Sequence, residues 1–358
     1  MLIGAGVAGL SAAFALARRG ASVVLADGGH AGQSSWAGAG IVCPLMPWDY
    51  GEEMNQLALA GMAEWPSFAA TLREISGLDT EFWACGMEVL NGSALSHSER
   101  KLGLILDWCQ KHDFHAERHA DHLWLPSVAQ VRNPRLIAAL SAAIQTLGGH
   151  ILQNCNITGL KNKGRRVISV LSDTHEYQAD NFVLAAGAWS GLSIGSLVPP
   201  PQIRPVRGQM LLYAPGGHTL GHILYRKGVY LVPRKDGHLL AGSTLEDAGF
   251  DATTTVDALA HLHESACDLL PALRGQSPIR SWSGLRPGSP DNIPLIDRHP
   301  DFDNLWIHTG HFRYGVTMAP SSSRLLTELM LGETPSINPT PYSWQAALTR
   351  SWPSSQPC

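Results

Sequence analysis

The sequence predicts an α/β protein with a Rossmann-type nucleotide-binding domain and a second, α+β domain built on an antiparallel sheet. The first thirty residues read as strand, glycine-rich turn, helix and second strand, which is the order of a dinucleotide-binding unit. Residues 206–243 instead contain short apolar strands joined by turns, a pattern typical of antiparallel sheets. The chain of 358 residues is long enough for two such domains.

The opening turn occupies residues 4–9, and a helix is expected directly after it. Gly4 permits the tight turn, Gly6 lets the backbone approach a pyrophosphate, and Gly9 lets the helix pack closely on the first strand. The N–H groups that open the helix, together with its dipole, favour a phosphate at this position. The expected phosphate-binding residues are Gly4, Gly6, Val7, Ala8 and Gly9.

Asp27 ends the second strand, where a carboxylate can accept hydrogen bonds from an adenosine ribose. This favours a nucleotide without a 2′-phosphate, such as FAD or NAD. Residues 34–44 are dense in small side chains, which allow the backbone to lie close to a flat ligand. An ordinary flexible loop is the alternative, but the apolar pair 41–42 and the closing Pro44 argue against it.

Charge and hydropathy exclude several classes of protein. The net charge of -4 and the lack of a Lys/Arg block argue against nucleic acid or an anionic membrane as partner. No run of apolar residues is long enough to span a bilayer. The apolar residues 1–21 imitate a signal peptide, but their basic residues follow the apolar run instead of preceding it. The six cysteines have no paired spacing, which suits reduced thiols and a cytoplasmic location.

Four histidines crowd residues 112–122, and a helix would place His115, His119 and His122 on one face. Polar surface is the simpler interpretation of this stretch, so we expect no metal site.

The other elements follow in order. We expect a helix over 54–76 with a break near Pro66, then strands at 83–90 and 123–125 with a helix between them. A helix from Pro134 to Leu147 precedes strands at 150–157, 166–171 and 181–186. The last of these strands continues through Ala186 into Gly187 and Trp189. A buried strand that ends in such small residues is typical of the place where a nucleotide-binding domain passes beneath its cofactor.

Prolines at 199–201 and 205 indicate a crossing between domains. Strands are expected at 206–213, 225–233 and 238–243, and helices at 255–270 and 316–331. The Pro/Ser-rich end reads as a loosely ordered tail. The expected domains are nucleotide binding over 1–48, 128–198 and 284–335, substrate binding over 49–127 and 199–283, and a tail over 336–358.

Seven motifs occur in the order seen in FAD-dependent D-amino-acid oxidases, and the whole chain most resembles the thiamine-pathway glycine oxidases of bacteria. Besides the opening turn, they are residues 34–38, 131–134, 184–190, 205–210, 282–288 and 310–320. The resemblance implies a glutathione-reductase-like FAD domain. It also implies that FAD is held without a covalent bond, because no cysteine stands where sarcosine oxidases attach flavin.

The resemblance implies a reaction as well. Glycine, a small D-amino acid or N-methylglycine is oxidised to its imine, and then to an oxo acid and ammonia, while oxygen becomes hydrogen peroxide. The imine of glycine is handed to a thiazole-forming enzyme. Since the cofactor performs the electronic work, we expect no general base.

In this resemblance Arg286 holds the substrate carboxylate, Tyr230 assists it, and Arg313 closes the pocket near the amine. Ile41 and Leu245 occupy positions of apolar pocket residues. A structural acid such as Asp291 is the alternative partner for Arg286. Tyr314 departs from the asparagine that the family usually has, and it is expected to narrow the pocket. The cofactor residues implied are Ser34, Ser35, Ala39, Gly40, Ile41, Ala186, Gly187, Trp189, Gly310, His311, Phe312, Arg313, Gly315, Val316 and Thr317.

Two other functions stay open at this point. One is a D-amino-acid dehydrogenase or sarcosine-type oxidase that uses another electron acceptor or amine. The other is a flavoprotein subunit without turnover. The sequence also leaves open whether the chain forms a homo-oligomer.

Overall fold

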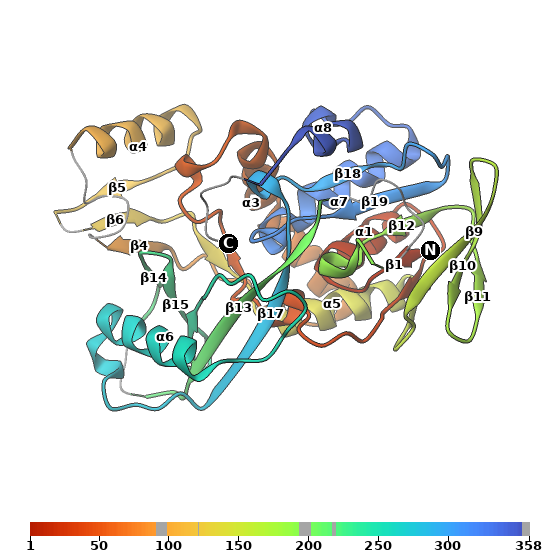
Figure 1. Ribbon diagram of the computed structural model, residues 1–358. Helices are drawn as coiled ribbons and strands as arrows, with labels where there is room; N and C mark the ends of the chain where they lie inside the picture. The colour runs from red at the N-terminus through yellow and green to blue at the C-terminus, as the bar shows by residue number, and fades with distance from the viewer. Residues whose placement is uncertain (91–98, 121, 193–201, 217–219, 353–358) are drawn as a thin grey trace.

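The computed structural model describes residues 1–90, 99–120, 122–192, 202–216 and 220–352. Its two larger sheets lie side by side, and the long strands β13 and β17 run between the two halves (Figure 1). The predicted fold class is confirmed. The predicted crossing at prolines 199–201 lies outside the described residues.

The first sheet has six strands, and all its neighbours pair in parallel except β18 with β19. In spatial order the strands are β18 (Leu295–Arg298), β19 (Leu305–Thr309), β12 (Phe182–Leu184), β1 (Leu2–Ile3), β2 (Val24–Ala26) and β8 (His150–Leu152).

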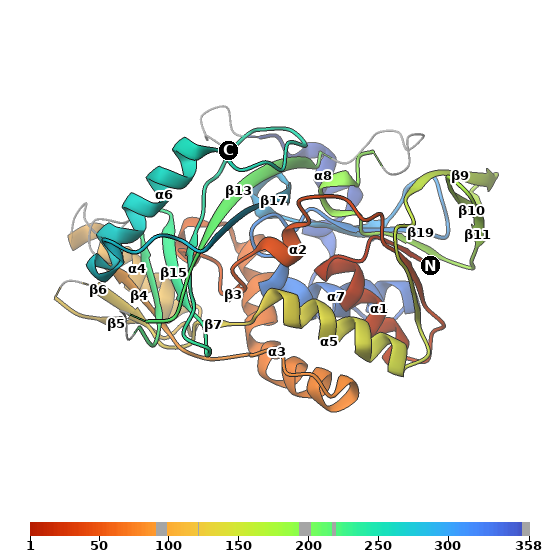
Figure 2. The same ribbon diagram turned by 90° about the horizontal axis from the view of Figure 1, so that it is seen from below.

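Alternate residues of the sheet face two different cores, which explains why its central strands β1, β2 and β12 are apolar throughout. Leu2 and Leu25 pack with the helices α1 (Val7–Arg18), α5 (Asn133–Thr146) and α7 (Gly315–Leu331). These helices lie together, and α1 contacts both of the others (Figure 2). Ile3 and Ala26 pack instead with residues of a three-stranded antiparallel sheet, β9 (Ile157–Lys163), β10 (Arg166–Ser172) and β11 (Glu176–Gln178).

The second sheet has eight strands, and every neighbouring pair is antiparallel except β14 with β4. In spatial order they are β17 (Arg280–Gly288), β13 (Arg204–Tyr213), β16 (Leu239–Gly242), β15 (Val229–Pro233), β14 (Ile223–Arg226), β4 (Met87–Leu90), β6 (His122–Leu125) and β5 (Glu117–Arg118). Helix α6 (Val256–Leu269) packs on β13 and β15.

Smaller elements accompany the two sheets. They are the helices α2 (Ser34–Ala37), α4 (Glu99–Lys111) and α8 (Trp344–Thr349), the paired strands β3 (Ile41–Val42) and β7 (Ala129–Gln130), and the 3₁₀ turns Pro47–Asp49, Gly187–Trp189, Pro271–Leu273, Pro290–Asn292 and Thr340–Tyr342. No helix of the described residues is long and apolar enough to cross a bilayer.

Helix α3 (Glu52–Ser76) corrects the predicted break near Pro66, because it runs through the proline. Pro66 lies on the exposed face of the helix, where water can solvate the carbonyl that loses its donor. Trp65 and Leu72 are fully buried on the opposite face, and their packing keeps the helix continuous.

A turn at Lys227-Gly228 corrects the predicted single strand over 225–233, which is a hairpin of β14 and β15. Both turn residues have positive φ (49° and 87°), as a tight two-residue hairpin turn requires. The histidines of residues 112–122 do not share one helix face. That region contains the exposed strand β5, and the described residues hold no group of three or more His, Cys, Asp or Glu side chains suited to a metal.

The C-terminal segment corrects the predicted loose tail as far as residue 352. Tyr342 is fully buried and its hydroxyl donates to the Glu53 carbonyl at 2.6 Å. Trp344 is buried as well, and its backbone N–H donates to the Asp297 carboxylate at 2.8 Å. The burial of these two aromatic residues orders a segment whose polar composition had predicted a loose tail.

Candidate active site

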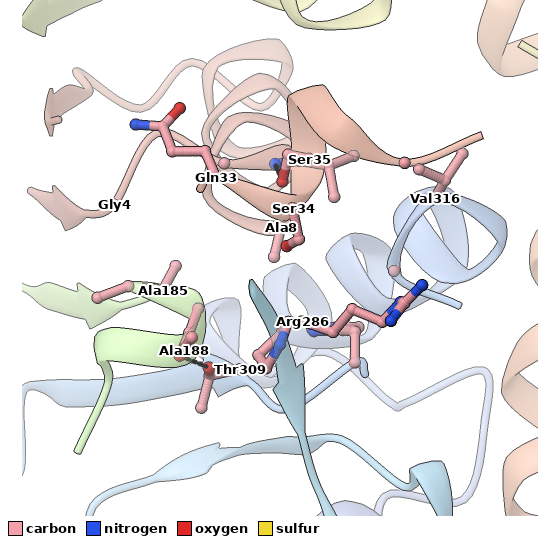
Figure 3. A pocket seen from close by; sticks show the side chains of 18 of the residues that line it. Gly4, Ala8, Gln33, Ser34, Ser35, Ala185, Ala188, Arg286, Thr309 and Val316 are labelled. Carbon is pink, nitrogen blue, oxygen red and sulfur yellow. Dashed lines mark hydrogen bonds between the residues drawn. The ribbon is translucent and has the colours of Figure 1, made fainter. Parts of the chain in front are cut away.

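A cavity of about 1440 Å³, counting the space at its mouth, opens where the carboxyl ends of the parallel strands meet the second sheet. Figure 3 shows Gln33, Ser34 and Ser35 on one side and Ala185, Ala188 and Thr309 on the other. The lining includes the sequence-predicted residues Gly4, Gly6, Val7, Ala8, Asp27, Ser34, Ser35, Ala39, Gly40, Ile41, Ala186, Gly187, Trp189, Tyr230, Arg286, Gly310, His311, Phe312, Arg313, Tyr314, Gly315 and Val316.

Three predicted site residues do not line the cavity: Gly9, Leu245 and Thr317. Gly9 faces the first strand. Leu245 lies on a segment held against β13, where the Glu246 N–H donates to the Arg207 carbonyl at 3.0 Å. Thr317 lies inside α7, where its hydroxyl donates to the Ile41 carbonyl at 3.2 Å and so supports a residue that does line the cavity.

The glycine turn is as tight as predicted. Gly4 has φ +112°, and a Cβ there would lie 2.3 Å from the Ala185 carbonyl oxygen. A Cβ on Gly9 would lie 2.0 Å from the Gly4 carbonyl oxygen. The Val7 N–H, the first of α1, donates to the Ser35 hydroxyl at 2.8 Å, whereas the N-cap residue Gly6 has no side chain that could bind the other N–H groups. This turn therefore presents uncapped helix N–H groups to the cavity, as a phosphate site needs.

Asp27 lines the cavity at the end of β2, the position predicted for a ribose. Its Oδ1 accepts hydrogen bonds from the Gly29 N–H and the Gln33 amide, both at 3.1 Å. Gln33, which departs from the residues usual in the resembling family, thus orients the carboxylate.

Arg286 extends from β17 into the cavity (Figure 3). Its guanidinium donates to the Ser243 hydroxyl at 2.7 Å and to the Thr244 carbonyl at 3.2 Å. Burial lowers the pKa of Arg286, and no carboxylate, Asp291 included, forms an ion pair with it among the described residues. Gly208 on β13 makes room for it, since a Cβ there would lie 2.2 Å from a guanidinium nitrogen.

Tyrosines surround Arg313, the second arginine of the lining. Burial lowers its pKa, but Tyr314, Tyr50, Tyr225 and Tyr230 outweigh this effect and raise the pKa above the usual value. The Tyr314 and Tyr50 hydroxyls are 2.6 Å apart and hydrogen bonded. The tyrosine that replaces asparagine is therefore buried and fixed against Tyr50.

Sequence reasoning missed His308, the last residue but one of β19, which lines the cavity. It is fully buried, and its ring lies 4.7 Å from that of His311. Burial lowers the pKa of His308 to about 4, and the nearby Ala8 backbone offsets only part of this. Its place at the carboxyl end of a parallel strand is the feature that identifies it.

Because His308 is neutral in the folded protein, we expect the free energy of unfolding to fall at acid pH. Because its folded pKa lies below the unfolded value near 6.5, the unfolded chain binds more protons between these values, and stability falls as pH decreases through this window. We expect His308→Gln to reduce the loss of unfolding free energy between pH 7.5 and 5.5 by about 1 kcal/mol. Urea denaturation of both holoproteins at the two pH values measures this, and equal pH dependence would assign the acid sensitivity elsewhere.

The comparisons agree with this geometry. The sequence matches the family described as FAD dependent oxidoreductase over residues 2–329. The glycine oxidase of Pseudomonas aeruginosa is 39% identical, with 96% of this chain and 97% of that protein covered. The bifunctional protein ThiO/ThiG of Trichormus variabilis is 30% identical, with 92% of this chain but 52% of that protein covered.

The crystal structure of glycine oxidase from Geobacillus kaustophilus has a TM-score of 0.87, with 24% identity and 96% of each chain covered, and so shares the fold. The glycine cradle, the start of α1 and the residues that line the cavity fit FAD. The chain belongs to the FAD-dependent oxidoreductase family of the D-amino-acid oxidases.

Proposed function

We propose that the protein oxidises glycine, small D-amino acids or N-methylglycine to the imine, with oxygen as the final acceptor. One observation carries the proposal: Arg286, half-buried and without an acidic partner in the described part of the chain, lines the same cavity as the glycine turn. A carboxylate is the ligand that a planar guanidinium binds best. The 39% identity to a glycine oxidase supports the substrate class.

FAD, when bound, takes up the two electrons that the amine loses on becoming an imine and passes them to oxygen, which becomes hydrogen peroxide. The protein's own residues position the substrate. Arg286 holds the carboxylate, Tyr230 borders it, and Ile41 and Tyr314 restrict the space for a side chain. Such positioning contributes up to about 7–11 kcal/mol to lowering a barrier, so no general base is required.

The residues proposed to hold FAD form three groups along the cavity. The glycine turn and Asp27 would hold the adenosine diphosphate half, and residues 34–41 with 186–189, which line the same cavity, would hold the rest of the cofactor. Residues 310–316 provide the uncapped start of α7, whose N–H groups stabilise negative charge on the reduced cofactor. Burial raises the pKa of the Cys43 thiol in the same lining, which keeps it protonated and supports FAD bound without a covalent bond.

We also propose that the glycine imine passes to a thiazole-forming enzyme. The relative named bifunctional ThiO/ThiG supports this, because the present chain matches about half of its length. The free thiols of Cys43, Cys85, Cys109, Cys155 and Cys267 support a reducing, cytoplasmic setting.

Anaerobic titration of the yellow holoprotein with glycine, N-methylglycine, D-alanine and D-proline tests the proposal. We expect at least one of these amines to bleach the flavin absorbance, and admission of air to restore the colour and release peroxide. Bleaching without reoxidation by oxygen would indicate a dehydrogenase. Failure of all four amines to bleach the flavin would support a flavoprotein subunit without turnover.

A further inference from the structure

The charges in the cavity lining are unequal. Arg286 and Arg313 both line it, whereas Asp27 is the only carboxylate among its described lining residues. Asp27 lies at the end of β2 and is already hydrogen bonded to Gly29 and Gln33. Neither arginine therefore has a carboxylate partner among the described lining residues of the cavity.

Other buried arginines of this chain are neutralised or saturated with acceptors. The Arg207 side chain is 8% exposed and pairs with Glu246 at 2.6 Å and Asp251 at 2.8 Å. Arg234 is buried without an acid, but it donates to three oxygens, of Gln130, Val131 and Ala39. This fold thus follows the general rule that a buried guanidinium is compensated.

Arg313 departs from this pattern more strongly than Arg286, and both side chains are half-buried in the cavity lining. Arg286 donates to two neutral oxygens, whereas the guanidinium of Arg313 has no hydrogen bond or ion pair to the described residues. Its neighbours are the hydroxyl-bearing rings of Tyr50, Tyr225, Tyr230 and Tyr314, which favour its charged form. A substrate with one carboxylate on Arg286 leaves this second charge without an anion.

We propose that the substrate pocket is built for amines that carry two anionic groups, one for Arg286 and one for Arg313. The class comprises glycine derivatives with a second carboxylate or similar anion, attached at the nitrogen or at the α-carbon. This inference rests on the proposed function, since it concerns the substrate of that same reaction. The oxidised bond, the two electrons and their transfer to oxygen are unchanged.

A first experiment measures binding without turnover. The oxidised holoprotein is titrated with acetate and with malonate, succinate and glutarate, which separate two carboxylates by increasing distances, and the shift of flavin absorbance gives each Kd. We expect at least one diacid to bind at least ten-fold more tightly than acetate. Arg313→Met should bring that diacid to within about two-fold of acetate and leave the acetate Kd unchanged. Equal affinities in the wild type, or a diacid advantage that survives in Arg313→Met, would overturn the proposal.

Two further variants serve as controls. Arg298→Met removes an exposed positive charge outside the cavity, and it should leave every affinity unchanged. Arg313→Lys keeps the charge and should retain part of the diacid advantage, which also covers the case in which Arg313→Met fails to fold. Loss of the advantage in Arg298→Met would reveal a general effect of net charge and count against the proposal.

A second experiment measures turnover and locates the second anion. Values of kcat/KM are compared for iminodiacetate and its monoamide, and for D-aspartate and D-asparagine, with glycine as reference. We expect one diacid to exceed its amide at least ten-fold, with iminodiacetate favoured if Arg313 faces the nitrogen side and D-aspartate if it faces the α-carbon side. Arg313→Met should remove this difference between diacid and amide.

The two proposals fail in different ways. If no amine is oxidised, the proposed function fails. The diacid titration still shows whether Arg286 and Arg313 together bind two anionic groups. If glycine is oxidised but neither diacid exceeds its amide, only the present inference fails. An equal loss of glycine and diacid turnover in Arg313→Met would show that Arg313 serves the reduced cofactor instead, and would also overturn it.

Discussion

Replacing Arg286 by methionine is expected to lower kcat/KM for glycine on the order of 10²- to 10³-fold. The substitution removes the charged partner of the substrate carboxylate from a buried site, which costs roughly 3–4 kcal/mol at about 1.4 kcal/mol per ten-fold change. The methionine side chain fills most of the space along β17. The flavin spectrum and FAD content should therefore stay as in the wild type, because the lost interaction concerns only the substrate.

The substrate itself supplies the sharpest control for Arg286→Met. Ethylamine is glycine with a methyl group in place of the carboxylate, so its low turnover should not change in the variant. The ratio of kcat/KM for glycine to kcat/KM for ethylamine should therefore fall sharply in the variant. Arg286→Lys keeps a charge without the planar fork and should fall between the two proteins. Unchanged glycine kinetics in Arg286→Met would remove this residue from the substrate site.

Local chemistry made much of this site predictable. The glycines of residues 4–9 have fixed spacing, and their mechanical reasons, a positive φ at Gly4 and close packing at Gly9, are both present in the structure. Asp27 followed from its place after the second strand. The position of Arg286 was supplied by family resemblance, since nothing in its neighbouring residues shows that β13 leaves room for it at Gly208.

What sequence reasoning missed depends on contacts between distant segments. Pro66 reads as a helix break, yet the packing of Trp65 holds α3 together. The C-terminal segment reads as a polar tail, yet Tyr342 is anchored on Glu53, 289 residues away. His308 has no local motif, and its importance appears only when β19 is placed in the sheet beside β12. Such pairings are set by tertiary packing, which composition and periodicity do not encode.

The second large effect is expected from a single methyl group, in Gly9→Ala. The new Cβ would lie 2.0 Å from the Gly4 carbonyl oxygen, far inside van der Waals contact, and backbone cannot move aside as a flexible side chain can. Helix α1 must therefore shift away from β1, and its uncapped N–H groups lose their alignment with the phosphates. We expect purified Gly9→Ala to contain little or no FAD, measured by the ratio of flavin to protein absorbance. Its stability should fall by roughly 1–3 kcal/mol or more, as for other overpacked sites.

Gly103→Ala is the matched control, since it makes the same chemical change on the exposed face of α4, where a Cβ would meet nothing within 4 Å. Alanine is the better helix former by about 1 kcal/mol, so this variant should keep its FAD and unfold at the same or a slightly higher temperature. The contrast separates the effect of a methyl group on α1 from any effect of alanine as such. A Gly9→Ala protein as yellow and as stable as Gly103→Ala would show that close contact between α1 and β1 is not what holds the cofactor.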